Sequence, residues 1–123
     1  MSSHLLRISL FATVAFAFAN PMAHAEETLG LEVGKALQQA QSALAGHNYA
    51  KAMAAVDQAD AVKGKTDYDT YTITQMRAAV ATQAGNVAAA TAAYDKLIAS
   101  SRTPKATKQQ MLMSEGTMAY TAK

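Results

Sequence analysis

The stretches "GHNYAKAMAAVDQADAV" (46–62) and "GNVAAATAAYDKLIAS" (85–100) repeat one pattern at a constant offset of 38 in the numbering. Each begins with a glycine close to an asparagine. Large and small apolar residues then alternate at helical intervals, so that Ala52 corresponds to Ala90. An internal repeat of this length is typical of arrays built from similar helical units.

The rest of the chain also favours helices. Alanine, glutamine, lysine and methionine are good helix formers, and Pro104 is the only proline beyond residue 25. Apolar residues recur at intervals of three and four, as in an amphipathic helix. No stretch long enough for a strand alternates between apolar and polar residues. The sequence therefore predicts an all-α fold of about five helices, at 31–45, 49 to about 62, 67–84, 87 to about 100, and 105 to the chain end.

Polar and small residues mark the expected helix ends. Gly46 is predicted to take the left-handed conformation that closes the first helix, and His47 is interpreted as an insertion after it. Asparagine and threonine side chains are good acceptors for free N–H groups at helix starts. The predicted N-caps are Asn48, Asn86 and Thr66, the last in a capping box with Asp69.

The segment 1–25 is typical of a cleavable secretory signal peptide. Arg7 supplies a positive charge, and "ISLFATVAFAFA" (8–19) forms an apolar core that is too short to span a bilayer as a stable helix. The small-x-small motif "AHA" follows. Cleavage before Glu26 would leave one domain, 26–123, and would place it in the periplasm or outside the cell.

The composition of the segment 26–123 excludes several classes of function. The formal charge falls from +2 to +1 on cleavage, because Arg7 is the one charged side chain removed. This near-neutral balance predicts neither a nucleic-acid partner nor an anionic membrane surface, and no membrane span is expected after cleavage. The chain has no cysteine, so neither a lipid anchor on cysteine nor a disulfide scaffold is expected.

Candidate catalytic and ligand-binding motifs have simpler interpretations. "GKT" at 64–66 lacks the earlier glycine and the preceding strand that a phosphate-binding loop requires. His47 is the only histidine beyond residue 25, so no histidine-based metal site is predicted. The carboxylate pairs Asp57/Asp60 and Asp67/Asp69 are explained by solvation and helix capping. The sequence therefore predicts no enzyme, no cofactor and no metal.

Two aspartates recur at the repeat spacing. Asp57 and Asp95 each follow a large residue that is expected to face the core. One interpretation is that both mark the solvent side of their helices. The other is a repeated contact with the neighbouring hairpin, and the sequence leaves both open.

The second helix of each unit resembles that of a tetratricopeptide repeat. Such a helix has a turn residue, a large or aromatic residue, a small residue three positions later and another large one four positions after that. The matching residues are Asn48, Tyr49, Ala52, Val56 and Ala59 in one unit and Asn86, Val87, Ala90 and Tyr94 in the other.

This resemblance implies stacked antiparallel helical hairpins. The implied units are about 31–66 and 67–104, followed by a lone helix at 105–123. Ala78 and Gly116, which are related by the same offset, suit the small site at which the two helices of a unit cross.

The resemblance also implies that the first helices of successive units line a surface that binds a protein or peptide. In the second unit this surface lies opposite Ile73, Met76 and Val80. It is polar and uncharged, so it fits an extended peptide backbone or a partner helix better than a carboxylate or phosphate. The candidate residues are Thr72, Gln75, Ala79, Thr82 and Gln83.

The last helix is expected to carry a second candidate surface. Its large apolar residues exceed what one helix can bury against an alanine-rich neighbour. We expect further repeats, a second copy or a binding partner to cover them. These residues are Met111, Leu112, Met113, Met118 and Tyr120.

The sequence therefore predicts a non-enzymatic scaffold for protein or peptide binding. The alternative is a structural, assembly or accessory segment of a longer exported protein.

Overall fold

The computed structural model describes residues 27–121, which form five α-helices. The predicted all-α fold is confirmed, and the first four helices lie within two residues of their predicted boundaries. The signal peptide predicted at 1–25 lies outside the described residues. The helices are α1 (Leu31–Ala45), α2 (Tyr49–Asp60), α3 (Asp67–Gln83), α4 (Val87–Ala99) and α5 (Lys105–Thr121).

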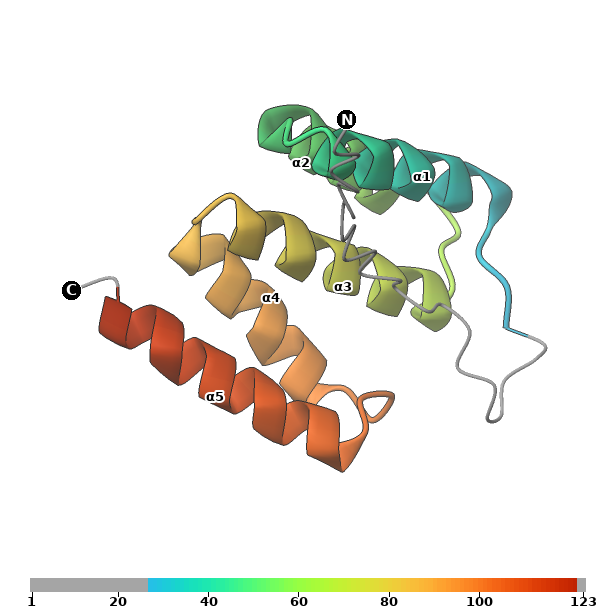
Figure 1. The fold of residues 1–123 in the computed structure, drawn as a ribbon. Helices are drawn as coiled ribbons and strands as arrows, with labels where there is room; N and C mark the ends of the chain where they lie inside the picture. Colours follow the sequence, from blue (N-terminus) through green and yellow to red (C-terminus); the bar gives the residue numbers. More distant parts are fainter. Residues whose placement is uncertain (1–26, 122–123) are drawn as a thin grey trace, which may run out of the picture.

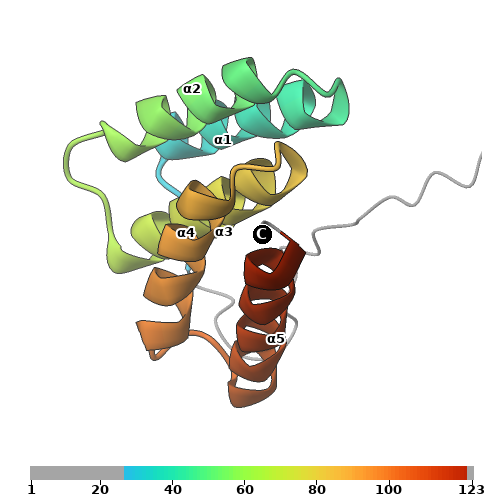
Figure 2. The same cartoon turned by 90° about the vertical axis from the view of Figure 1, so that its left-hand side faces the viewer.

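The helices form two stacked hairpins and a fifth helix at the end of the stack (Figure 1). α1 packs against α2, and α3 packs against α4. α3 also contacts both helices of the first hairpin, whereas α5 contacts α4 alone among the described helices. Figure 2 shows the resulting order, with α1 and α2 in one layer, α3 and α4 in the next, and α5 beside α4.

Alanine allows the helices of the first hairpin to approach closely. Ala40, Ala52 and Ala59 are completely buried, in one cluster with larger residues such as Val56 and Ile73. Small side chains at these crossings remove the voids that ordinary helix spacing would leave. The first hairpin and α3 therefore share one continuous core.

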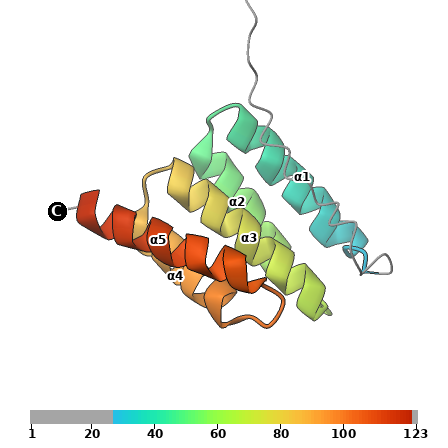
Figure 3. The same cartoon turned by 60° about the horizontal axis from the view of Figure 1, so that its bottom comes forward.

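The second hairpin has a smaller core. Ala78, Ala93 and Leu97 form it, and Tyr94 and Met111 are packed partly against it. Figure 3 shows α5 lying across α4 at the outer side of this hairpin. The burial that holds α5 is therefore less extensive than the burial that holds the first three helices together.

The turns inside the two hairpins have the same geometry. Asn48 donates its backbone N–H to the carbonyl of Ala43 at 2.9 Å, and Asn86 makes the equivalent bond to Ala81 at 2.9 Å. The side chains of Asn48 and Asn86 both accept a bond from the N–H three residues later, so both predicted N-caps are confirmed.

This shared geometry corrects two expectations about the first turn. Gly46 has φ −84° and is not left-handed. The left-handed residue is His47, with φ 57°, and its counterpart is Gly85, with φ 73°. His47 is therefore no insertion, because it occupies the place of Gly85 at the repeat offset. Sequence reasoning chose the wrong residue because glycine adopts this conformation far more readily than histidine.

A buried carboxylate joins the beginnings of α1 and α3. Asp69 accepts the N–H of Thr66 at 3.0 Å and donates its own N–H to the Thr66 hydroxyl at 3.1 Å, which confirms the predicted capping box. Its other carboxylate oxygen accepts the N–H of Gly30, the N-cap of α1, at 2.9 Å. One side chain thus satisfies free donors at two helix starts that are far apart in the sequence.

These contacts hold the pKa of Asp69 below its ordinary value of 3.8, chiefly through the bond from Gly30. The folded protein therefore binds this proton less tightly than the unfolded chain does. The resulting stability is fully present above the unfolded pKa, and it is lost as pH falls through the lowered pKa of the folded state.

We predict that Asp69→Ala lowers the free energy of unfolding by about 1–3 kcal/mol at neutral pH, because two part-buried N–H groups lose their acceptor. Urea denaturation from pH 7 down to about pH 2 measures the effect. The difference from wild type should shrink as pH falls below about 4. The control is Asp67→Ala, at an exposed site in the same helical turn. Equal losses in both variants would refute the role assigned to Asp69.

Candidate partner-binding surfaces

The candidate surface on α3 is smaller than the sequence predicted. Thr72 is only 1% exposed, and its hydroxyl donates to the carbonyl of Tyr68 at 2.9 Å. The expectation that Thr72 faces a partner is therefore wrong. Its helical position places it close to Met76, on the side of α3 that packs against the first hairpin.

The other α3 candidates retain some access to solvent. Gln75 is half-buried, and Thr82 and Gln83 are exposed. The Thr82 hydroxyl lies 3.3 Å from the hydroxyl of Tyr94 on α4. This exposed contact links the end of α3 to α4, and Gln83 beside it is exposed to solvent.

A cleft that the sequence did not predict lies between α3 and α4. The two helices diverge from their connecting turn (Figure 1), so the first half of α3 is separated from the last turn of α4. The cleft has a volume of about 360 Å³. Its lining residues are Asp67, Thr70, Tyr71, Thr74, Lys96, Leu97, Ser100, Ser101 and Arg102.

Several polar groups of this cleft are engaged within the protein. Tyr71 hydrogen-bonds the buried Thr103 at 3.0 Å, and Thr74 donates to the carbonyl of Thr70. Arg102 makes two bonds to Glu27, at 2.7 and 2.9 Å, and lies 5.7 Å from the centre of the Tyr68 ring. Tyr71, Thr74 and Arg102 are therefore already bonded within the protein, whereas Asp67 and Lys96 line the cleft as exposed side chains.

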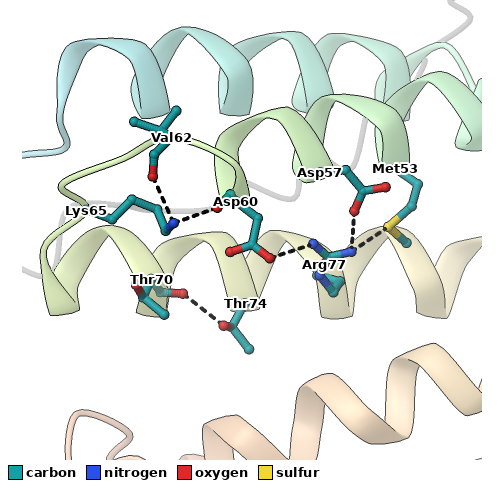
Figure 4. Close-up of polar contacts among 8 residues, drawn as sticks. All are labelled: Met53, Asp57, Asp60, Val62, Lys65, Thr70, Thr74 and Arg77. Atoms are coloured by element: carbon teal, nitrogen blue, oxygen red, sulfur yellow. Dashed lines mark hydrogen bonds and ion pairs between the residues drawn. The ribbon is translucent and has the colours of Figure 1, made fainter.

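A charged cluster joins α2 to α3 (Figure 4). The Arg77 guanidinium contacts Asp57 at 2.8 Å and Asp60 at 3.4 Å, and it lies 3.4 Å from the sulfur of Met53. Asp57 therefore contacts the neighbouring hairpin, which was one of the two interpretations of the repeated aspartates. Arg77 had not been singled out, because its partners belong to the preceding helix.

At the contact between α4 and α5, the position equivalent to Arg77 holds a carboxyl group instead of a guanidinium. At the repeat offset, Asp95 corresponds to Asp57 and Glu115 corresponds to Arg77. Burial, followed by the negative charge of Asp95, raises the pKa of Glu115 above its ordinary value. One Glu115 oxygen, Oε1, is buried without a hydrogen-bond partner among the described residues. An ion pair therefore supports the α2/α3 contact, whereas two carboxyl groups face each other at the α4/α5 contact.

The candidate residues of α5 divide between two faces. Met111 and Met118 are half-buried. Met113 and Tyr120 are 72% and 79% exposed, and Leu112 beside them is 53% exposed. The predicted excess of apolar side chains on α5 is therefore present, and it lies on the face turned away from α4.

Small residues at the predicted helix crossings also differ between the units. Ala78 is buried against Ala93 and Leu97, as a crossing requires. Gly116 is exposed, and a Cβ added there would meet no atom within 4 Å. No described helix crosses α5 at Gly116, so the expected crossing there stays a prediction.

Comparison with known proteins adds no relative. No protein-family model, curated protein or solved structure matches this chain. Among residues 27–121, no helix combines the length and hydrophobicity needed to cross a membrane.

We predict that Glu115→Arg stabilises the protein by up to about 1 kcal/mol at neutral pH, because it places an arginine opposite Asp95 as Arg77 is placed opposite Asp57. Thermal unfolding of Glu115→Arg, Asp95→Ala and the double variant measures the coupling. The gain should disappear when Asp95 is absent.

Glu115→Gln is the matched control for the charge pair. The raised pKa means that Glu115 favours folding at low pH and loses this contribution as pH rises through the folded value. Glutamine should remove that pH dependence without creating an ion pair. A stabilisation by arginine that persists in the Asp95→Ala background would contradict the proposed equivalence of the two interfaces.

Proposed function

We propose that this chain is an exported, non-enzymatic scaffold, similar to tetratricopeptide-repeat modules, that binds a protein or peptide partner through the uncovered face of α5. The observation that carries this proposal is the exposure of Leu112, Met113 and Tyr120 on a helix that, among the described helices, contacts α4 alone. Exposed apolar residues that cluster on one element are typical of interaction sites.

The chemistry of this face suits a protein partner. Met113 has a flexible, polarisable side chain that adapts to different shapes. Tyr120 combines a large apolar ring with a hydroxyl that can remain hydrated or form a hydrogen bond, a combination enriched at interfaces. Leu112 adds apolar area beside them. Burial of this face against a partner would remove apolar surface from water and so favour association.

Two further observations support the wider proposal. The turns at His47 and Gly85 share their hydrogen-bond pattern at the repeat offset, as expected for hairpin repeats. The segment 1–25 has the charge, apolar core and small-residue motif of an export signal. Both are consistent with a periplasmic or secreted repeat module.

A structural role is the second candidate, and the position of Gly116 favours it. Gly116 corresponds to Ala78, the residue of α3 that packs against α4. A helix equivalent to α4 could therefore pack on α5 within a larger exported assembly. In that role the α5 face stacks permanently and does not exchange partners.

We predict that the native protein is exported and begins at Glu26, because the signal sequence ends in a motif that signal peptidase recognises. N-terminal sequencing of the protein released from the periplasm of a bacterial host provides the measurement. Recovery of the native protein with Met1 at its N-terminus would show that 1–25 is retained.

We predict that the double variant Met113→Lys/Tyr120→Ser loses partner capture, because it places a charge in the apolar face and removes its largest ring. Wild-type and variant proteins are immobilised and exposed to periplasmic extract, and retained proteins are compared by mass spectrometry. The matched control, Gln38→Lys/Gln41→Ser, makes a similar change on the exposed side of α1.

A partner should be retained by the wild type and the control and lost only from the α5 variant. Circular dichroism of all three proteins checks that each remains folded. Equal capture by the two variants would place the binding site elsewhere, and absence of any partner would favour the structural role.

A further inference from the structure

Four residues on the uncovered side of α5 form what we term the α5 stripe. Their intervals of four, three and four positions place them on one side of a helix. All four are exposed, and the half-buried residues of α5 lie on the opposite side. The α5 stripe consists of Gln109, Met113, Gly116 and Tyr120.

The α5 stripe carries no charge. The charged residues of α5 are Lys105, Lys108 and Glu115. Lys108 and Glu115 are half-buried on the side of α4, and Lys105 lies at the first position of the helix. A second copy of the same surface could therefore approach without like charges meeting at its centre.

The order of residues in the α5 stripe is complementary to itself when reversed. The intervals read the same in both directions, with their midpoint between positions 114 and 115. In an antiparallel pair, the long side chain of Met113 therefore lies opposite the open site at Gly116, and this contact occurs twice. Gln109 lies opposite Tyr120, so an amide faces a phenol hydroxyl with which it can hydrogen-bond.

We infer that the α5 stripe pairs with the same stripe of a second copy, antiparallel and about a two-fold axis. Such an isologous contact is the commonest way in which identical chains associate. The open space at Gly116 is what admits the methionine. This inference rests on the proposed function, because it names a second copy as the partner that covers α5.

The expected association is weak and depends on concentration. One face of a single helix buries less than the roughly 1,600 Å² of a standard interface. We therefore expect a dissociation constant in the micromolar range, with monomer and dimer in exchange.

Sedimentation equilibrium of the exported protein, over about 1 to 500 µM, brackets this range. Wild type should shift from monomer to dimer. Gly116→Leu should remain monomeric, because leucine fills the site that receives Met113. Its melting temperature at low concentration should not fall, since the new side chain meets open space and favours helix.

Two further variants make the test specific. Met113→Ala/Gly116→Met exchanges the large and small residues, so the antiparallel pair regains its fit and the dimer should return. Ser114→Leu adds the same leucine at an exposed position outside the stripe, and it should leave the dimer unchanged.

Crosslinking tests the orientation of the pair. The chain has no cysteine, so Gln109→Cys and Tyr120→Cys each introduce a single thiol. In the antiparallel arrangement, a mixture of the two variants should form a disulfide dimer under mild oxidation, and neither variant should do so alone. Efficient crosslinking of each variant alone would indicate parallel helices and overturn the inference.

A monomer at every concentration, or a dimer that Gly116→Leu leaves intact, would also overturn the inference. Neither result decides the proposed function, because the capture experiment tests binding of other proteins independently. A monomeric protein that captures a partner through Met113 and Tyr120 would retain the proposed function and lose the self-pairing.

Discussion

The stacking of this protein depends on one buried carboxylate, that of Asp69. It accepts hydrogen bonds from the backbone N–H groups of Gly30 and Thr66, so it caps the N-terminal ends of α1 and α3 at the same point. A Cβ at Gly30 would lie 3.4 Å from a carboxylate oxygen, which is an ordinary van der Waals distance, so the contact depends on the backbone N–H of residue 30 and not on the absence of a side chain there. With the two helix starts fixed, α3 lies along the first hairpin, and Arg77 comes within reach of Asp57 on α2.

Burial and ionic pairing decrease along the stack from this fixed point. The first hairpin and α3 share a continuous core and an Asp–Arg ion pair. The core between α3 and α4 is smaller, α5 packs against it through the partly buried Met111, and Asp95 faces Glu115 where the arginine would be. Local opening starts where burial is least and polar groups are poorly paired, so α5 is expected to be the first helix to separate. The candidate binding face therefore lies on the least firmly held element.

The sequence predicted local structure well because its signals are local. Asparagine and threonine caps gave helix boundaries within two residues, since each cap bonds an N–H only three positions away. Thr72 was misplaced because it lies at the edge of the apolar side of α3, where periodicity does not separate burial from exposure. The Gly30–Asp69 bond and the cleft between α3 and α4 depend on how helices stack and diverge, which no single helix pattern contains.

Gly116 lies in the interior of α5, where glycine is an unusual residue. A glycine inside a helix costs about 1 kcal/mol relative to alanine, and that cost is ordinarily repaid by a close approach that a Cβ would prevent. Ala78 shows such an approach against α4, whereas Gly116 has open space around it in the described chain. No contact among the described residues therefore offsets the cost of glycine at this position. Glycine becomes favourable at this position once a large side chain from another molecule enters the space. In the antiparallel pair inferred above, Met113 of the second copy lies opposite Gly116 and has the length to enter it.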